Sequence, residues 1–229
     1  MAKFHFVEDY ERYVQLLMRH HPIDEAMSIA VGGKYEEIGR VECAIMRHAG
    51  LRDGHRLVDF GCGSGRLAVS LAREVQIDYL GLDVVKPLID YARTRCPAAY
   101  RFALNPTLTL PVDTASIDYV AAFSIFTHLL HTETYLYLEE MLRCLKPGGM
   151  VVCSFLEFAM GSHWEVFTQT VEQQRTSTTP HINQFTERNQ ITLWAERLGY
   201  ASVAFIDGSA APWPSGEVLG QSIALLRKA

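Results

Sequence analysis

The stretch LVDFGCGSGR, residues 57–66, decides the fold because an apolar run ends beside a carboxylate and passes directly into a glycine-rich turn. The run has the length and character of a buried strand. Gly61, Gly63 and Gly65 then allow the chain to turn sharply and bring backbone N–H groups into contact with a ligand. A strand, a glycine turn and a helical segment in this order are typical of a nucleotide pocket.

Strand-like and helix-like segments alternate on both sides of this turn. Apolar runs of strand length lie at residues 55–60, 78–83, 99–104, 117–123 and 149–156, and helical patterns separate them at residues 66–75, 86–95 and 132–145. Such alternation predicts crossover units on a parallel sheet. Because the strands are continuously apolar, we expect helices on both faces, which gives a doubly wound α/β fold.

The two ends of the chain extend this core. At the front, helical patterns at residues 7–20 and 35–49 are separated by a predicted connector at residues 21–33. At the other end, a predicted helix at residues 187–198 is followed by two strands, at 200–206 and 221–228. The two strands fit an antiparallel pair at the edge of the sheet.

The overall composition excludes several classes of protein. The chain is 48% apolar and 21% charged, as in ordinary globular proteins, and no apolar run approaches the roughly 18 residues of a membrane span. The first residues lack the pattern of a secretory signal, so we expect a cytoplasmic protein without membrane association. Five cysteines without any CxxC pair predict neither a zinc site nor another metal site. The net charge of −5 argues against a nucleic-acid partner and favours a small molecule, and the oligomeric state stays open.

Three features distinguish between possible ligands of the glycine turn. The spacing is GxGxG, with Arg66 where a dinucleotide fingerprint would place its third glycine. Asp59, two residues before the first glycine, would repel a pyrophosphate but suits a cationic group such as an ammonium. Asp83 ends the next strand, where its carboxylate can accept hydrogen bonds from two ribose hydroxyls.

Four blocks in the same order resemble the class I S-adenosylmethionine (SAM) dependent methyltransferases. They are VDFGCGSGR, GLD, SIDYVAAFSIFTHL and RCLKPGGMVVCSF, within roughly residues 30–156. This resemblance implies a Rossmann-like sheet of seven strands, mostly parallel with the last strand antiparallel, and SAM as the cofactor at the carboxyl ends of the strands. We therefore predict one domain, 1–229, made of a helical lid (1–50), a SAM-binding core (51–156), an acceptor-pocket insertion (157–186) and a C-terminal helix and strand pair (187–229).

The resemblance also implies roles for individual residues in cofactor binding. Asp59 and the backbone of Gly61, Cys62, Gly63 and Gly65 would hold the methionine part, Asp83 the ribose, and Val84, Leu104 and Asn105 the adenine, with Phe123 and Ser124 beside the sulfonium. Many family members have an acid where this chain has Asn105. An amide can accept the same bond from the adenine amino group, and backbone groups at Leu104 are the alternative.

The residues of the acceptor side follow from their position along the chain. His128, just after the fourth strand, is the candidate general base; the alternative is that it caps a helix or packs under the cofactor. Glu157, His163 and Trp164 are candidates for the acceptor pocket, although Trp164 could equally belong to an aromatic helix face.

Two further residues, Tyr35 and Arg66, each have two possible roles. Tyr35, a further candidate for binding the acceptor, could belong, with Tyr10 and Tyr13, to a lid hinged at Gly32 and Gly33, or to a helix core. Arg66 could meet a carboxylate of the cofactor or acceptor, or point to water.

Three functions remain open on these grounds. The leading one is a SAM-dependent methyltransferase that acts by in-line displacement on an oxygen or nitrogen of a small metabolite, sugar or natural product. Nucleobase methylation is disfavoured because the fourth strand lacks a [DN]PP[YFW] segment. The alternatives are a nicotinamide-dependent oxidoreductase and a SAM-binding protein without catalysis.

Overall fold

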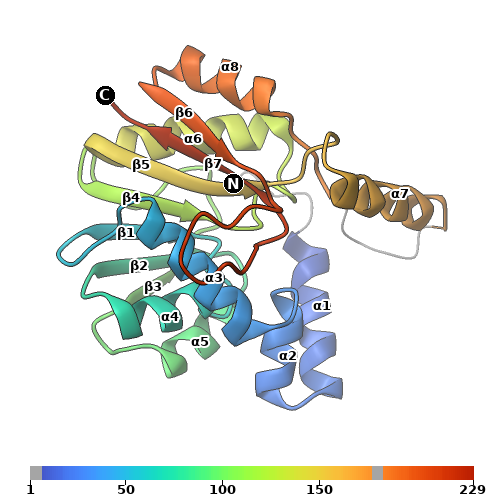
Figure 1. The fold of residues 1–229 in the computed structure, drawn as a ribbon. Coiled ribbons are helices and arrows are strands. Elements are labelled where there is room, and N and C mark those ends of the chain that lie inside the picture. Colours follow the sequence, from blue (N-terminus) through green and yellow to red (C-terminus); the bar gives the residue numbers. More distant parts are fainter. Residues whose placement is uncertain (1–6, 177–182) are drawn as a thin grey trace.

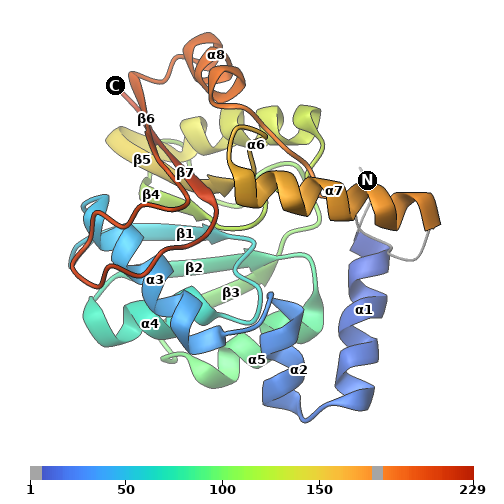
Figure 2. The same cartoon turned by 45° about the vertical axis from the view of Figure 1, so that its right-hand side comes forward.

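The computed structural model describes residues 7–176 and 183–229, which form one sheet covered by helices (Figures 1 and 2). The strands are β1 (Arg56–Phe60), β2 (Asp78–Asp83), β3 (Arg101–Leu104), β4 (Ile117–Ala122), β5 (Leu145–Phe155), β6 (Ser202–Ile206) and β7 (Ser222–Arg227). The helices are α1 (Val7–His20), α2 (Ile23–Ala30), α3 (Tyr35–His48), α4 (Arg66–Glu74), α5 (Lys86–Arg95), α6 (His131–Cys144), α7 (Gly161–Thr176) and α8 (Arg188–Leu198).

The sheet has seven strands in the order β3-β2-β1-β4-β5-β7-β6. Neighbouring strands from β3 to β5 are parallel, and β7 runs antiparallel to both β5 and β6. The predicted doubly wound sheet with an antiparallel last strand is therefore confirmed. The order reverses between β1 and β4, where the crossovers diverge to opposite sides and leave a crevice at the strand ends.

Two apolar cores lie on the two faces of the sheet. On one face, α6 and α8 pack over residues such as Val58 and Val120. On the other face, α3, α4 and α5 pack over residues such as Leu57 and Tyr119. Because Leu57 and Val58 are neighbours that contact opposite cores, the strand is buried on both faces, as its continuous apolar run predicts.

The N-terminal segment differs from the prediction at one element. Residues 23–30 form helix α2, where a connector was expected. Met27 of α2 and Val14 of α1 are buried against Val85 and Leu88 at the start of α5. An eight-residue helix is marginal by itself, so its formation depends on this tertiary contact.

The predicted insertion contains helix α7, which projects beside the sheet and lies near α1 in both views (Figures 1 and 2). Residues 1–6 of the predicted lid and residues 177–182 of the predicted insertion lie outside the described residues.

Candidate active site

A cavity of about 540 Å³ opens at the carboxyl ends of the central strands. Its walls come from the ends of β1, β2, β4 and β5, from α1, α2 and α7, and from the residues just before β7. This volume lies in the range of roughly 300–1,000 Å³ that is usual for small-molecule sites. The position is the one at which open α/β sheets bind their ligands.

The glycine turn forms the floor of this cavity. A Cβ atom at Gly61 would lie 2.0 Å from Cδ1 of Ile125, and one at Gly63 would lie 2.7 Å from Cγ1 of Val31. Both glycines also have positive φ angles, 75° and 54°. The loop after β4 and the end of α2 can therefore close directly onto the turn only because these positions have no side chain.

Asp59 lies at the end of β1 and lines the cavity, with 3% of its surface exposed. Its Oδ2 accepts a hydrogen bond of 2.6 Å from the Tyr79 hydroxyl. Burial raises the pKa of Asp59 to about 7, the Tyr79 bond lowers it, and the nearby Glu42 carboxylate raises it. A cation beside Asp59 would lower this pKa and favour the ionised carboxylate. An ammonium group of a ligand could therefore form an ion pair with Asp59.

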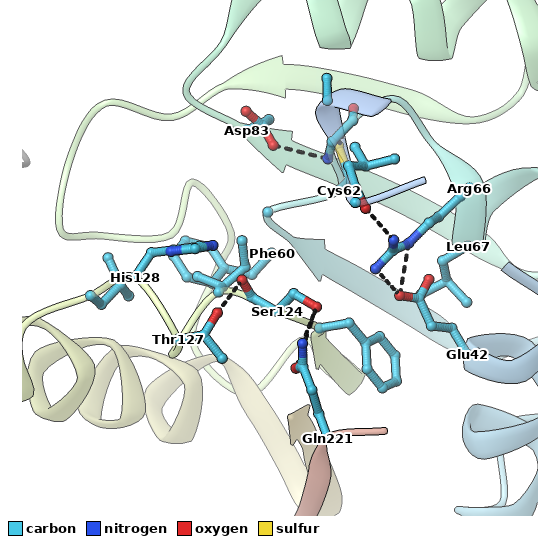
Figure 3. Close-up of a pocket in the computed structure, with 18 of the residues that line it drawn as sticks. Glu42, Phe60, Cys62, Arg66, Leu67, Asp83, Ser124, Thr127, His128 and Gln221 are labelled. Carbon is cyan, nitrogen blue, oxygen red and sulfur yellow. Dashed lines mark hydrogen bonds and ion pairs between the residues drawn. The ribbon is translucent and has the colours of Figure 1, made fainter. Parts of the chain in front are cut away.

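Asp83 at the end of β2 also lines the cavity and connects two parts of its floor. Its Oδ2 accepts from the Gly63 backbone N–H at 2.9 Å (Figure 3), and its Oδ1 accepts from Val85 N–H at 2.9 Å. Burial raises its pKa and these backbone bonds oppose the shift. Each carboxylate oxygen retains a further lone pair for a ligand hydroxyl.

Asn105 follows β3 and is 5% exposed. Its Oδ1 accepts a hydrogen bond from Thr107, whereas its Nδ2 is buried without a partner among the described residues. A buried donor without a partner on a cavity wall is costly unless a ligand acceptor meets it. Together with Val84 and the two carboxylates, this side of the cavity fits the hydroxyls, ring nitrogens and ammonium group of an amino-acid nucleoside such as SAM.

An ion pair that the sequence did not reveal lines the same side. Glu42 of α3, 1% exposed, accepts a 2.9 Å hydrogen bond from Nε of Arg66, which also donates to the Val31 carbonyl (Figure 3). Burial raises the pKa of Glu42 and Arg66 opposes the shift. Arg66 therefore binds a protein carboxylate and the end of α2, and it does not point to bulk water. The pair was missed because its members are 24 residues apart and no local motif connects them.

Phe123 and Ser124 end β4 and line the cavity, as expected for the wall beside the sulfonium. Ser124 has a φ angle of 59°, a conformation that is unfavourable for a residue with a side chain. Three hydrogen bonds hold it: its N–H donates to Ser154 at 2.7 Å, its carbonyl accepts from Thr127 at 2.9 Å, and its hydroxyl accepts from Gln221 Nε2 at 3.0 Å. Figure 3 shows Ser124 between Thr127 and Gln221. Gln221, just before β7, was not predicted, since nothing in its local sequence distinguishes it.

Both predicted histidines line the cavity. His128 lies in the loop after β4, and its backbone N–H donates to the Ile125 carbonyl at 2.9 Å. His163 of α7 has both ring nitrogens engaged, because Nδ1 accepts from Glu157 N–H at 3.0 Å and Nε2 lies 2.9 Å from the Gly220 carbonyl. The ring of His163 therefore connects α7 to the end of β5 and to the residues before β7, and of the two histidines we keep His128 as the candidate base.

Two residues predicted to bind the cofactor lie outside the cavity wall. Gly65 faces α5, where an added Cβ would lie 2.9 Å from Cβ of Ala92, so the absence of a side chain lets helices α4 and α5 pack closely. Leu104 is 46% exposed and only its neighbour Asn105 reaches the cavity. The alternation of side chains along β3 directs these two neighbours to opposite sides.

Three residues predicted to bind the acceptor also lie outside it. The Tyr35 hydroxyl donates to the Ser64 carbonyl at 2.8 Å, behind the glycine turn. Glu157 is paired with Arg188 at 2.7 Å and accepts from Ser222, so it joins the last helix to β7. Trp164 is 50% exposed and packs on Phe158 and Phe167, the aromatic alternative noted for it.

Other features of the cavity come from the N-terminal helices. Tyr10 and Tyr13 of α1 line the cavity, and the Tyr10 hydroxyl donates to the Ala30 carbonyl at 2.5 Å.

Within residues 7–176 and 183–229, no group of three or more His, Cys, Asp or Glu side chains could hold a metal ion. No helix in the same ranges combines the length and apolar character needed to cross a membrane.

Comparison with known proteins finds methyltransferases that are similar to part of this chain. A family described as "Methyltransferase domain" matches residues 57–149. The chain is 32% identical over 114 residues to a demethylmenaquinone methyltransferase of Staphylococcus aureus, which covers 48% of this chain and 46% of that protein. It is 27% identical over 157 residues to the biotin biosynthesis bifunctional protein BioHC of Cellvibrio japonicus, covering 69% of this chain and 30% of that protein. The chain thus spans less than half the length of these relatives.

Solved structures share the fold at low sequence identity. One is a SAM-dependent methyltransferase of Thermotoga maritima, described as a possible histamine N-methyltransferase. The two structures match with a TM-score of 0.65 at 17% identity, over 98% of this chain and 99% of that one. A Haemonchus contortus phosphoethanolamine N-methyltransferase, solved with S-adenosylhomocysteine, has a TM-score of 0.66 at 21% identity, over 90% of this chain and 46% of that one.

Proposed function

We propose that the chain transfers a methyl group from SAM to an oxygen or nitrogen of a small-molecule acceptor, because its residues 57–149 match a methyltransferase domain and its fold is shared by a SAM-dependent methyltransferase. The observation that carries the proposal is the cavity at the strand ends, where Asp59 and Asp83 from adjacent strands meet the buried donor of Asn105. The names of the relatives, which refer to demethylmenaquinone and to biotin biosynthesis, support a small molecule as the acceptor.

The residues that would hold the cofactor are those of the glycine turn and the first three strand ends. Asp59 would take the ammonium group, Asp83 the ribose hydroxyls, and Asn105 a ring nitrogen of the adenine, against which Val84 would pack. When bound, SAM supplies a methyl group on a sulfonium, which is already a strong electrophile.

The protein's part in such a reaction is alignment and exclusion of water. Ser124 and Ile125 would shape the wall between cofactor and acceptor, while Tyr10 and Tyr13 cover the cavity from the side of α1. We further propose that α1 and α2 act as a lid, supported by the positive φ angles of Gly32 and Gly33, whose Cβ positions are open. The rest of the predicted lid, α3, packs in the core over the sheet and is not part of this proposal.

We propose His128 as the group that removes a proton from the acceptor, supported by its place on the cavity wall after β4. Replacing His128 by Ala should then slow turnover by about 10²-fold or more while leaving the affinity for S-adenosylhomocysteine unchanged. The matched control is His131→Ala, because His131 lies just outside the cavity and contacts the Phe185 carbonyl. Equal rates for the two variants would assign His128 a packing role.

The deciding experiment is a pair of calorimetric titrations, one with S-adenosylhomocysteine and one with NAD. Binding of the first ligand alone supports the proposal, and binding of NAD alone would favour the oxidoreductase. Incubation with methyl-labelled SAM and a fractionated bacterial metabolite extract then separates an enzyme from a SAM-binding protein without catalysis, because only the enzyme yields a labelled product.

We place this activity in the cytoplasm and expect no nucleic-acid partner. All five cysteines are free, as expected in a reducing compartment, and the net charge is −5.

A further inference from the structure

Charge is divided unevenly between the two halves of the cavity. The cofactor half is formed by α1, α2, α3, the glycine turn and the ends of β1, β2 and β3. The acceptor half is formed by the loop after β4, the end of β5, α7, Asn183 and the residues just before β7. Of the residues that the structure describes, four that line the cavity are Asp, Glu, Lys or Arg, and these four, Glu42, Asp59, Arg66 and Asp83, belong to the cofactor half.

The acceptor half is lined by uncharged groups. Among the described residues of its wall, none is Asp, Glu, Lys or Arg. Its apolar surface comes from Ile125, Leu129, Leu156, Val166 and Leu219, which belong to four separate parts of the chain. Because these positions are far apart in sequence, the apolar character is a property of the assembled wall and not of one helix.

The polar groups of this half are largely engaged with the protein. Both ring nitrogens of His163 contact backbone groups, and the Gln221 amide bonds Ser124 and Ser154. Nδ2 of Asn183 donates to Thr170 at 3.1 Å. Such groups can accept or donate one further hydrogen bond, but they carry no charge that could neutralise an ion. His128, which also lines this half, must be neutral in order to take a proton from the acceptor, so it supplies no counter-charge to the incoming molecule.

The first charged residue after the end of β5 is paired away from the cavity. Glu157 directly follows Leu156, yet its carboxylate accepts from Arg188 and Ser222. Arg188 in turn also pairs with Asp207. This network therefore offers neither a counter-anion nor a counter-cation to a molecule in the acceptor half.

We propose that the acceptor is uncharged at the end that enters the acceptor half, as a hydroxyl-bearing apolar molecule is, and that alkylammonium, carboxylate and phosphate groups are excluded there. The inference rests on the proposed function and specifies its substrate class. An ion that leaves water for a wall without a counter-charge loses its hydration without compensation, whereas a neutral apolar group gains by the transfer.

The test compares three probes that share one ring system: 2-naphthol, 2-naphthoate and 2-naphthylmethylammonium. Each is titrated calorimetrically into the full chain at pH 7, with and without saturating S-adenosylhomocysteine. We expect 2-naphthol to bind about tenfold or more tightly than either ion. An ion that binds as tightly as 2-naphthol, or the absence of binding by all three probes, would overturn the inference.

Two variants at one position make the result specific to charge. Val166→Asp should raise the affinity for the cationic probe and lower that for the anionic probe, and Val166→Lys should do the reverse. Thr168→Asp, on the exposed side of α7 and outside this cavity, is the matched control and should change neither. Simple damage to the fold cannot produce opposite shifts in the two variants, so unchanged preferences in both would contradict the proposal.

The same titrations keep this inference separate from the proposed function. Failure of S-adenosylhomocysteine to bind would remove the proposed function. Normal binding of S-adenosylhomocysteine together with a preference for an ion would remove only the inference about the acceptor.

Discussion

The cofactor half and the acceptor half of the cavity differ in how the chain builds them. The cofactor half uses strand ends and the turn after β1, so two of its three carboxylates, Asp59 and Asp83, come from short motifs at residues 57–66 and 78–85, and only Glu42 comes from a distant helix. The acceptor half assembles single residues from the β4 loop, β5, α7 and the segment before β7. Residues close together in the sequence can therefore supply most of a site for a common cofactor, whereas the acceptor site exists only once distant segments come together.

The prediction with the largest expected effect concerns how much the buried Glu42–Arg66 pair of the cofactor half stabilises the fold. Arg66→Ala should lower the free energy of unfolding by about 3 kcal/mol, because Glu42 would be left buried without its partner. Arg73→Ala is a matched control on the same helix, since Arg73 pairs with Glu36 of α3 at an exposed position and should cost below about 1 kcal/mol. Urea denaturation measures both. Equal losses of unfolding free energy in the two variants would mean that the buried pair stabilises the protein no more than the exposed pair does.

Asp83→Ala tests the ribose site of the cofactor half. We expect the affinity for S-adenosylhomocysteine to fall by about 1–3 kcal/mol, the usual cost of losing hydrogen bonds to a charged group. Asp78→Ala is the control at the other end of β2, where Asp78 pairs with Arg101 on the surface. Calorimetry should detect a change only for Asp83→Ala, and a silent Asp83→Ala variant would show that the ribose lies elsewhere.

The pH dependence of binding tests Asp59. Because its pKa is raised to about 7, Asp59 is protonated below that pH and must release a proton to pair with an ammonium group. The affinity for S-adenosylhomocysteine should therefore rise about fivefold between pH 6 and pH 7, rise about twofold more to pH 8, and level off above pH 8. For folding the sign is opposite: a raised carboxyl pKa makes this group's contribution to stability decrease as pH rises from about 4 to about 7.

Asp59→Asn provides the control for this pH dependence. Glu42, Arg66 and Asp83 surround the site and remain in the variant, so any residual pH dependence belongs to them. We expect the rise between pH 6 and pH 7 to be largely lost. An unchanged profile in Asp59→Asn would assign the titration to Glu42 or Asp83.

The prediction with the smallest expected effect tests whether the acceptor half can be altered without changing binding in the cofactor half. Gln221→Ala removes a hydrogen bond that supports the unfavourable backbone of Ser124, so the affinity for 2-naphthol should fall about fivefold, which corresponds to about 1 kcal/mol. The affinity for S-adenosylhomocysteine should not change. Gln190→Ala, whose side chain contacts His131 outside the cavity, is the control. Loss of affinity for both ligands would show that the halves are coupled.

Short-range patterns in the sequence predicted most of the sheet. Each predicted strand coincides with an observed one, because continuous apolar runs between glycine turns are a property of neighbouring residues. Helix α2 was missed, since its eight residues are helical only when Met27 packs against α5. Among the site residues, Asp59, Asp83 and Asn105 line the cavity as their place at strand ends implies. Their roles in binding stay predictions.

By itself, the sequence determined the succession of strands and helices, the sharp turn after β1 and the carboxylates at two strand ends. These features depend on residues within a few positions of one another. Only the tertiary structure decided that Glu42 pairs with Arg66, that Gln221 supports Ser124 across 97 residues, and that Glu157 faces Arg188 instead of the cavity. The physical reason is that burial and pairing depend on which distant segments meet, and a charged side chain is directed to the partner that neutralises it.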